Sequence, residues 1–434
     1  MRIIKFQRGR ILVEDPGEDS FLVPAIEYRQ IIEDSKSKGE EIRDEVSNAP
    51  STPFLKSDFI ARFYQVESVE AWERTGKRGI IVLPTGAGKT IVAIKAMESA
   101  QVATLIVVPT IVLLEQWRNT LEGAFQVPIG GLGGGYNEIK PITVATYDSA
   151  ALRANSIGNL FHLIIFDEVH HLPTPRNSGI GLNYIAPMRL GLTATLGDEP
   201  EVLESLEQLV GSVIYKKKVD DLAGIHLSDY TIRTIPIALT PQEKLDYDRM
   251  YQAYRNFLQR SGIKIRSAAD YMSFVRRSGV DPEARRALLA RNAAMDIALN
   301  SSGKINYLKN ILQANPDVKT IIFTRHNKLV YKISRLLLIP AITHQTVSEE
   351  RRSILDNFKS GSYRRIITSQ VLDEGIDVPD AALAVILSGT GSSRQFIQRL
   401  GRILRKREGK QAVLVELVSM ETAETRISQR RKQE

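Results

Sequence analysis

The chain has 434 residues, with 58 Lys and Arg against 50 Asp and Glu, and carries a formal net charge of +8 at pH 7. It has no cysteine, which excludes disulfides, thiolate zinc sites and cysteine-ligated iron–sulfur clusters. The longest uncharged stretch, residues 99–114, is interrupted by Pro109 and is too short to span a membrane. We therefore expect a cytoplasmic protein of about three domains, with no membrane contact and an anionic partner such as nucleic acid.

The first 55 residues form a short N-terminal region without an active-site motif. Residues 1–30 alternate apolar and polar side chains, and residues 27–44 form a charged stretch that we expect to be helical. Pro50 and Pro53 give residues 48–53 the composition of a linker, because proline fixes φ and denies a helix its hydrogen bond. We place the first domain boundary there, between residues 55 and 56.

Two α/β regions follow, at residues 56–228 and 229–434. In both, uninterrupted apolar runs alternate with helical patterns, which predicts strands buried on both faces and therefore a parallel sheet wrapped by helices. The expected strands are 80–83, 104–108, 142–145, 163–166 and 190–194, then 320–324, 365–368, 383–388 and 412–418. Within the second region, residues 240–301 are expected to form a continuous helical insertion.

A phosphate-binding loop follows the first expected strand. It consists of Thr85, Gly86, Ala87, Gly88, Lys89 and Thr90, and Leu83 stands where the strict pattern has glycine. The glycines permit close backbone approach to phosphate, the lysine neutralises the β- and γ-phosphate oxygens, and the last hydroxyl ligates Mg²⁺. An ordinary glycine-rich turn is the alternative. One such loop for two sheets predicts a nucleotide cleft that the two regions share.

An acidic pair ends the expected strand at 163–166. Asp167 is suited to bind Mg²⁺ through water, and Glu168 to orient and deprotonate the attacking water. A solvated acidic loop is the alternative interpretation of this pair taken alone. His170 and His171 follow, but neither an HExxH spacing nor any cysteine supports a zinc site. We assign His170 to coupling and His171 to packing or to the surface.

Arg402 and Arg405 are three residues apart on an expected helix and therefore project from nearly one face. An arginine delivered to the γ-phosphate contributes about 10³–10⁵ in rate, so hydrolysis would depend on closure of the two regions. A basic helix on a solvated face is the alternative. The position of these arginines in the region without a phosphate loop favours the catalytic interpretation.

In this order, the segments resemble the motifs of superfamily 2 helicases, and most closely those of the archaeal XPB family. The similarity runs over about residues 62–431. The segments that carry it are residues 62–65, 83–90, 108–110, 145–147, 167–173, 191–195, 322–326, 369–377 and 398–405. The resemblance implies two RecA-like domains, a thumb-like role for the helical insertion, and ATP and Mg²⁺ as cofactors.

The resemblance also implies roles for individual residues. Lys89, Asp167, Glu168, Gln398, Arg402 and Arg405 would be catalytic, and His170, Thr193 and Thr195 would couple the two sheets. Arg62 and Gln65 would read adenine, and Gly375 and Asp377 would line the closed nucleotide cleft. Thr110, Thr146, Arg325 and Thr368 would face the DNA backbone. Phosphate contacts carry no sequence information, so we expect binding that is largely sequence-independent and sensitive to salt.

The helical insertion interleaves aromatic and basic side chains. They are Tyr254, Phe257, Tyr271 and Phe274 among Arg255, Arg260, Lys264, Arg266, Arg276 and Arg277. This combination provides base stacking and attraction for a nucleic-acid backbone. It is equally typical of an amphipathic helical hairpin whose aromatic residues form a core and whose arginines are solvated.

The chain departs from the family pattern in two places. After Thr195 the family usually carries an Arg-Glu-Asp element used in opening DNA, whereas residues 196–201 here are Leu-Gly-Asp-Glu-Pro-Glu, without arginine. The chain therefore lacks the arginine that this device uses for strand separation. The family's DNA-damage-recognition module, if present within residues 1–55, is reduced.

The resemblance implies an ATP-dependent DNA helicase or translocase that moves 3′ to 5′. It would remodel or open DNA in transcription or in repair, such as nucleotide excision repair, acting on single-stranded DNA and duplex junctions. It also implies a nuclease partner and a place at the nucleoid of an archaeal cell. The alternatives are an ATPase scaffold that positions a nuclease with little unwinding of its own, an RNA-directed superfamily 2 helicase, and a restriction-type translocase.

Overall fold

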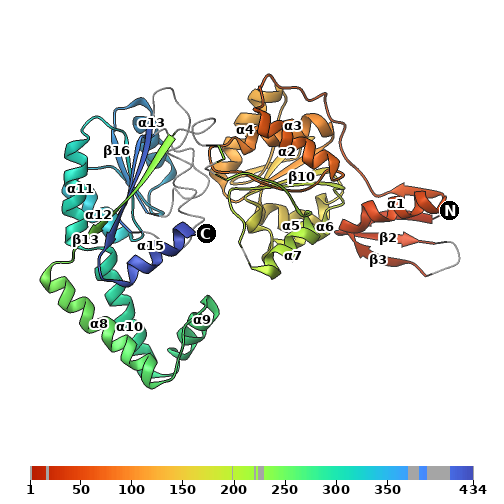
Figure 1. The fold of residues 1–434 in the computed structure, drawn as a ribbon. Helices are drawn as coiled ribbons and strands as arrows, with labels where there is room; N and C mark the ends of the chain where they lie inside the picture. The colour runs from red at the N-terminus through yellow and green to blue at the C-terminus, as the bar shows by residue number, and fades with distance from the viewer. Residues whose placement is uncertain are drawn as a thin grey trace. The chain divides into compact units, whose positions relative to one another are not determined.

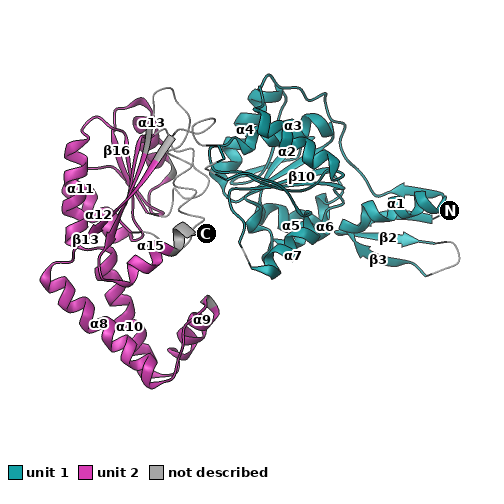
Figure 2. Ribbon diagram, viewed as in Figure 1, with its two compact units in different colours: residues 1–222 teal, residues 223–434 magenta. Residues whose placement is uncertain are grey.

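The computed structural model describes residues 2–15, 19–197, 199–218, 221–222, 229–369, 381–388 and 411–433. Two compact units divide the chain, residues 1–222 and 223–434 (Figure 2). Each is built on a mainly parallel sheet with helices, so the expected α/β class with two RecA-like domains is confirmed. No helix in the described ranges combines the length and the apolar character needed to cross a bilayer.

A small four-stranded sheet opens the chain, in the order β3-β2-β1-β4. Its elements are β1 (Arg2–Gln7), β2 (Arg10–Glu14), β3 (Phe21–Pro24), η1 (Ala25–Glu27), α1 (Tyr28–Lys38) and β4 (Ile42–Glu45). The expectation of helix throughout residues 27–44 is therefore wrong. Gly39 takes a φ of 67° and ends α1, because glycine enters the left-handed region without strain, and Ile42 then begins a strand parallel to β1.

This small sheet is fixed to the rest of the first unit. Ile185, which precedes the strand Met188–Thr193 of the large sheet, joins the apolar core that Ile4, Ile11 and Val46 form in the small one. The Asn159 side-chain amide donates to the Val46 carbonyl at 2.9 Å. Apolar burial and a buried hydrogen bond therefore hold the N-terminal region against the large domain.

The large sheet of the first unit has the order β12-β5-β11-β10-β6-β9-β7-β8 and is parallel except for the β7–β8 hairpin. Its strands are β5 (Arg78–Val82), β6 (Thr104–Val108), β7 (Gly130–Gly133), β8 (Tyr136–Glu138), β9 (Ile142–Thr146), β10 (Leu163–Asp167), β11 (Met188–Thr193) and β12 (Val213–Lys216). The helical segments are α2 (Phe63–Arg74), α3 (Lys89–Ala100), α4 (Ile111–Phe125), α5 (Tyr147–Ile157), η2 (Val169–His171), α6 (Ser178–Asn183) and α7 (Pro200–Leu209). Every residue of β6, β9 and β10 is buried, which explains their uninterrupted apolar sequences.

The sheet of the second unit has the order β13-β18-β17-β14-β16-β15, and its neighbouring strands are all parallel. Its strands are β13 (Asp229–Ile237), β14 (Thr320–Phe323), β15 (Ala341–Ile342), β16 (Arg365–Thr368), β17 (Leu383–Ile386) and β18 (Gln411–Ser419). Its helices outside the insertion are α11 (Ser302–Ala314), α12 (Asn327–Leu337), α13 (Ser348–Ser360) and α15 (Ala423–Gln433). The strands expected from the sequence are therefore present in both units.

Three helices make up the insertion, so the expectation of one continuous helix is wrong. They are α8 (Pro241–Arg260), α9 (Ala268–Arg277) and α10 (Pro282–Leu299), and α8 lies alongside α10 (Figure 1). The side chains of Thr240, Ser267 and Asp281 accept backbone N–H groups of the turns that follow them. Capping residues inside the stretch, together with Pro282, therefore divide it into separate helices.

The aromatic side chains of the insertion form a core of their own. Tyr254 and Phe274 are buried, and Phe257 and Tyr271 pack against them. The interleaved cations are exposed; they are Arg255, Arg260, Lys264, Arg266, Arg276 and Arg277. The structure therefore favours the amphipathic interpretation for Tyr254 and Phe274, whose rings have no exposed face for a base.

Candidate nucleotide and nucleic-acid sites

The loop after β5 has the backbone geometry of an anion cradle. Gly86 and Gly88 have φ angles of 85° and 81°, in the left-handed region that favours glycine. A Cβ at Gly88 would collide with the side-chain nitrogen of Gln65. Gly88 is also the N-cap of α3, whose first two residues are Lys89 and Thr90. The loop therefore opens on a helix N-terminus, where N–H groups and the helix dipole attract phosphate.

Side chains at the start of α2 hold this loop. The Tyr64 hydroxyl donates to the Ala87 carbonyl at 2.7 Å, and Gln65 Nε2 donates to the same oxygen at 2.9 Å. Gln65 Oε1 accepts the Arg62 backbone N–H at 2.8 Å. The structure thus brings Arg62 and Gln65 to the phosphate loop, and their reading of adenine stays a prediction.

Three segments that are far apart in the sequence meet at the carboxyl edge of the large sheet. Strands β5, β11 and β10 are parallel neighbours, and their register pairs Thr193 with Val82 and Asp167 with Leu192. The Leu83 N–H donates to the Thr193 carbonyl at 3.0 Å. The phosphate loop, the acidic pair and the end of β11 therefore lie at the edge where open α/β sheets bind their ligands.

Asp167 is the last residue of β10 and is 7% exposed. Burial and the negative charge of Glu168 raise the pKa of Asp167 to about 6, and the nearby Lys89 ammonium opposes this shift. Asp167 Oδ1 accepts the Glu168 N–H at 3.0 Å, and Oδ2 accepts the indole N–H of Trp117 at 2.9 Å. A buried carboxylate with a perturbed pKa beside a lysine is typical of a functional site.

Glu168 contacts the residues that the sequence assigned to coupling. It has φ 49° and ψ 57°, a left-handed conformation that is strained for a residue with a side chain. Its Oε2 lies 3.2 Å from the Thr193 hydroxyl and 3.5 Å from His170 Nδ1. The Thr193 hydroxyl, which has one proton to donate, also lies 2.8 Å from the Thr195 carbonyl. The His171 ring lies beside that of His170, with the ring centroids 4.4 Å apart.

The side chains at this edge fit a nucleoside triphosphate with Mg²⁺. Thr85 Oγ1 is buried and has no hydrogen-bond partner within the described ranges, so a bound group can satisfy it. Lys89 Nζ lies 3.4 Å from the Leu83 carbonyl, a long contact that a phosphate oxygen can replace. Thr90 and Asp167 supply the oxygen ligands that Mg²⁺ prefers.

Two further helix N-termini carry expected DNA contacts. Thr110 caps α4 and Thr146 caps α5, and each hydroxyl accepts a first-turn N–H at 3.3 Å. The glycine-rich β7–β8 turn lies against one of them, since a Cβ at Gly133 would be 2.9 Å from Thr146 Oγ1. The structure therefore places both threonines at positions that suit phosphate binding.

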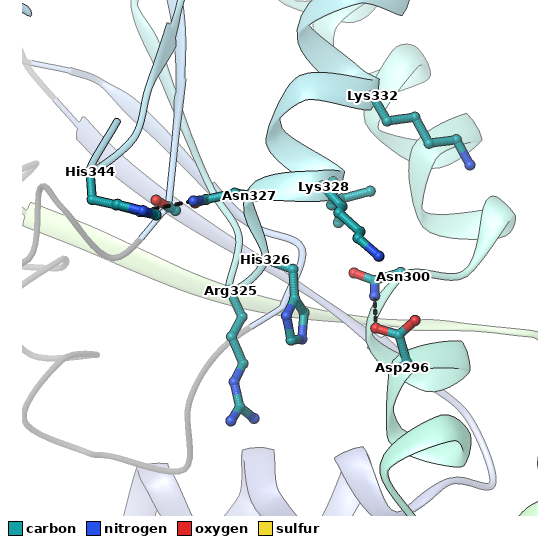
Figure 3. A pocket seen from close by; sticks show the side chains of 10 residues that line it. Asp296, Asn300, Arg325, His326, Asn327, Lys328, Lys332 and His344 are labelled. Atoms are coloured by element: carbon teal, nitrogen blue, oxygen red, sulfur yellow. Dashed lines mark hydrogen bonds between the residues drawn. The ribbon is translucent and has the colours of Figure 1, made fainter. Parts of the chain in front are cut away.

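A basic pocket of about 800 Å³ lies in the second unit, where the loop after β14 meets α10 and α12 (Figure 3). The side chains labelled there are Asp296, Asn300, Arg325, His326, Asn327, Lys328, Lys332 and His344. Burial and the charge of Arg325 lower the pKa of His326. Asn300 donates to Asp296 at 2.7 Å, and its Oδ1 is buried without a partner in the described residues. The pocket therefore combines cationic side chains that can bind phosphate with the Asn300 side-chain carbonyl oxygen, which can accept a hydrogen bond from a ligand.

Thr368 is fully buried at the end of β16, and its hydroxyl donates to the Ser369 carbonyl at 2.9 Å. Its contact with nucleic acid stays a prediction. Some expected site residues lie outside the described residues, namely Gly375, Asp377, Gln398, Arg402 and Arg405. Their roles in the cleft and as an arginine finger also stay predictions.

Sequence reasoning missed three aromatic residues of the first unit. Tyr64, Trp117 and Tyr147 are buried, and each donates its polar hydrogen to the phosphate loop or to the acidic pair. A buried indole or phenol needs a hydrogen-bond partner, so tyrosine and tryptophan near the motifs could have been expected to bond to site residues. The identity of each partner depends on strands and helices that are distant in the sequence.

Comparisons with known proteins agree with this geometry. Two family models match: "Type III restriction enzyme, res subunit" at residues 58–198 and "Helicase conserved C-terminal domain" at residues 303–407. The chain is 45% identical to the DNA 3′-5′ translocase XPB2 of Sulfurisphaera tokodaii, over 94% of this chain and 93% of that protein. It is 30% identical to the DNA 3′-5′ helicase XPB of Mycobacterium tuberculosis, over 80% of this chain and 58% of that protein.

A solved structure supports the fold alone. The Hef helicase domain of Pyrococcus furiosus matches with a TM-score of 0.55 at 19% sequence identity, over 85% of this chain and 97% of that one. The identity to the Sulfurisphaera protein extends over nearly the whole of both chains and confirms the resemblance read from the motifs. The chain belongs to the XPB family of superfamily 2 helicases.

Proposed function

We propose that the chain is an ATP-driven DNA translocase and helicase that moves 3′ to 5′ and remodels or opens DNA in repair or transcription. The meeting of the phosphate loop, the acidic pair and the end of β11 at one sheet edge carries this proposal. The relatives named as DNA 3′-5′ translocase and helicase support the choice of polymer and direction.

In the proposed ATP site, backbone N–H groups of the loop at Gly86 and Gly88 bind phosphate oxygens, and Lys89 neutralises their charge. Thr90 and Asp167 hold Mg²⁺, which when bound neutralises charge on the transferred phosphoryl group. The remaining nucleotide contacts are those expected from Arg62, Gln65, Thr85, Ala87, Gly375 and Asp377.

Glu168 is the proposed base that orients and deprotonates the attacking water. Its carboxylate lies 3.2 Å from the Thr193 hydroxyl, which supports a direct connection between the base and the proposed coupling residues His170, Thr193 and Thr195. Gln398, Arg402 and Arg405 complete the proposed catalytic set by stabilising the charge that develops on the γ-phosphate.

Thr110, Thr146, Arg325 and Thr368 are the proposed contacts with the DNA backbone. The two capped helix N-termini support the first pair, and the basic pocket supports Arg325 and adds Lys328 and Lys332 to the same proposal. Because these groups meet phosphates rather than base edges, binding is largely independent of sequence and weakens as salt rises.

The organisation of the chain follows from these roles. Residues 1–55 are the reduced recognition module, residues 56–228 the ATP-binding domain and residues 229–434 the second domain, in which residues 240–301 form the thumb. We place the protein in the cytoplasm of an archaeal cell, at the nucleoid, with a nuclease as its partner and single-stranded DNA and duplex junctions as substrates.

One alternative has a specific observation in its favour. Residues 196–201 lack the arginine of the family's Arg-Glu-Asp element, so the chain could hydrolyse ATP mainly to position the partner nuclease. Weak unwinding together with normal DNA-stimulated hydrolysis would favour this scaffold. An RNA-directed helicase is a second of the three alternatives, and the DNA names of the relatives speak against it.

ATP hydrolysis by the wild type and by Glu168→Gln tests the proposal, first without nucleic acid and then with single-stranded DNA, duplex DNA and RNA at fixed salt. We expect strong stimulation by DNA, and we expect Glu168→Gln to bind ATP but to lose about 10²–10⁴ in turnover. Normal turnover by Glu168→Gln would remove the proposed base. Glu168-dependent hydrolysis that ignores every polymer would favour the partner-controlled scaffold.

A further inference from the structure

Two buried side chains connect the expected DNA contacts to the acidic pair. Trp117 lies on α4, the helix that Thr110 caps, and its Nε1 donates to Asp167 Oδ2 at 2.9 Å. Tyr147 is the first residue of α5, directly after Thr146, and its hydroxyl donates to the Asp167 carbonyl at 3.1 Å. Each helix therefore begins at a proposed phosphate contact and bonds to the proposed ATP site.

The indole fixes the orientation of the Asp167 carboxylate. Trp117 is 3% exposed and Asp167 is 7% exposed, so water does not replace this bond. The Glu168 N–H donates to Oδ1 and the indole N–H donates to Oδ2, so hydrogen bonds to both oxygens orient the carboxylate. Hydrogen bonds to a charged group are stronger than those between neutral groups, typically by about twofold.

The Tyr147 phenol holds the peptide groups on both sides of Glu168. The Tyr147 hydroxyl lies 3.1 Å from the Asp167 carbonyl and 3.4 Å from the Glu168 carbonyl, so it reaches both peptide units beside the strained residue. A left-handed φ for glutamate persists only when its surroundings hold it. Tyr147 is buried, which keeps the pKa of its phenol well above the ordinary value and the hydroxyl protonated as a donor.

We propose that Trp117 and Tyr147 are positioning residues that couple DNA at the N-termini of α4 and α5 to the placement of Asp167 and Glu168. Helix α4 is unbroken from Ile111 to Phe125, and Trp117 lies about 10 Å along it from Thr110. A strand that displaces the N-terminus moves the indole with it, and a hydrogen bond weakens steeply as its distance and angle change. This coupling rests on the proposed function and explains how DNA stimulates hydrolysis.

Each conservative variant removes one hydrogen-bond donor. Trp117→Phe and Tyr147→Phe keep most of the apolar contact and lose the bond to the acidic pair. Matched controls exist within the same unit: Trp72 Nε1 donates to the Arg189 carbonyl at 2.9 Å, and the Tyr184 hydroxyl donates to the Ala150 carbonyl at 2.9 Å. Both control residues are fully buried, so Trp72→Phe and Tyr184→Phe carry a similar folding cost.

The first readout is the ratio of DNA-stimulated to basal ATP hydrolysis. The DNA affinity and the Mg²⁺ concentration that gives half the maximal rate are measured on the same variants. We expect Trp117→Phe and Tyr147→Phe to lower the ratio about tenfold and Trp117→Phe to raise the Mg²⁺ requirement, with DNA affinity unchanged. The controls keep the wild-type ratio. Equal loss of basal and stimulated rates, or an unchanged ratio, would overturn the coupling.

A second readout does not depend on turnover. Trp72 and Trp117 are the two tryptophans of the chain, so Trp72→Phe leaves Trp117 as its only indole. We expect its emission to change when single-stranded DNA is added without nucleotide, and Trp117→Phe to show no such change. Constant emission at saturating DNA would overturn the coupling alone. A wild type that no nucleic acid stimulates would overturn the proposed function as well, and the two failures are therefore distinguishable.

Discussion

The loop after β5 in the first unit and the loop after β14 in the second occupy the same place, between a buried parallel strand and a helix. The first contains two left-handed glycines and presents backbone N–H groups at the start of α3. The second, residues 324–326, has no glycine and leads through Arg325 and His326 into α12. A glycine loop lets the backbone itself approach a compact phosphate chain, whereas a loop with long cationic side chains suits a polymer backbone.

Each loop also continues into a lysine at the start of its helix. Lys89 is the first residue of α3, and Lys328 is the second residue of α12, where it lines the basic pocket (Figure 3). Under the proposed function, both strand–loop–helix units are anion sites, and the residues of each loop decide which anion binds. This interpretation predicts that the two lysines have separable functions.

Exchanging each of the two lysines for alanine tests this separation. Lys89→Ala removes the cation beside the nucleotide phosphates and lowers ATP turnover by roughly 10²–10³, while DNA affinity without nucleotide is retained. Lys328→Ala retains basal hydrolysis and weakens DNA binding for all sequences alike. Its salt slope falls by about 0.7–0.9, the contribution of one phosphate contact. ATP hydrolysis assays and DNA titrations at several salt concentrations measure both effects on both variants. Loss of basal hydrolysis in Lys328→Ala would contradict separate functions for the two lysines.

The two units also differ in how they bury a cation, and this difference predicts a stability effect. In the first unit Arg189 is fully buried and donates to carbonyl oxygens of residues 181, 184, 186 and 209. In the second unit Lys304 of α11 pairs with Glu424 of α15 at 2.7 Å and donates to the Leu387 carbonyl at 2.8 Å. Arg189 donates only to neutral carbonyl groups in these contacts, whereas Lys304 and Glu424 are opposite charges, so removing Lys304 takes away the ion pair of a buried carboxylate.

Lys304→Met is therefore expected to destabilise the second unit by about 3–5 kcal/mol. Hydrogen exchange of the amides in α11 and α15 measures this, because exchange reports each unit separately where a single melting curve does not. Lys304→Met combined with Glu424→Leu is the control and recovers most of the loss, since it removes both charges. A double variant as unstable as the single one would show that packing, rather than charge, is the cause.

The smallest expected effect concerns pH. Burial and the charge of Arg325 lower the pKa of His326 from its ordinary value of 6.5, whereas Asp296 raises it, so the imidazole is mostly neutral at pH 7.5. A phosphate favours the charged imidazole, so the pKa in the DNA complex is higher than in the free chain. DNA affinity therefore rises as the pH falls through the pKa of the complex and levels off below that of the free chain. The gain is at most about tenfold for each unit by which DNA raises the pKa.

DNA titrations between pH 7.5 and 5.5 measure this gain, with His326→Gln as the variant that lacks the imidazole. The variant is expected to keep only the pH dependence that other groups contribute. The same slope in both proteins would remove His326 from the pocket's contribution to DNA binding.

The central strands of both sheets followed from the sequence, because a strand buried on both faces needs an uninterrupted apolar run. The strands toward the sheet edges did not; they are β7, β8, β12, β13 and β15. The phosphate loop and the acidic pair followed for a similar reason, since each is a short segment whose chemistry is local. The helix boundaries were less predictable. Residues 240–301 have a helical pattern throughout, yet Ser267 and Asp281 cap new helices within it. Residues 39–45 leave the helical pattern because Gly39 ends α1 and β1 then accepts a parallel strand.

The sequence by itself determined the kind of chemistry, through glycines that permit a loop, a lysine and paired carboxylates at recognisable spacings. Only the tertiary structure decided which groups meet: Thr193 with Glu168, Tyr64 with the phosphate loop, and Trp117 with Asp167. The physical reason is the range of the interactions. Loop and helix preferences act between neighbours along the chain, whereas a buried hydrogen bond finds its partner only after the parallel strands have packed.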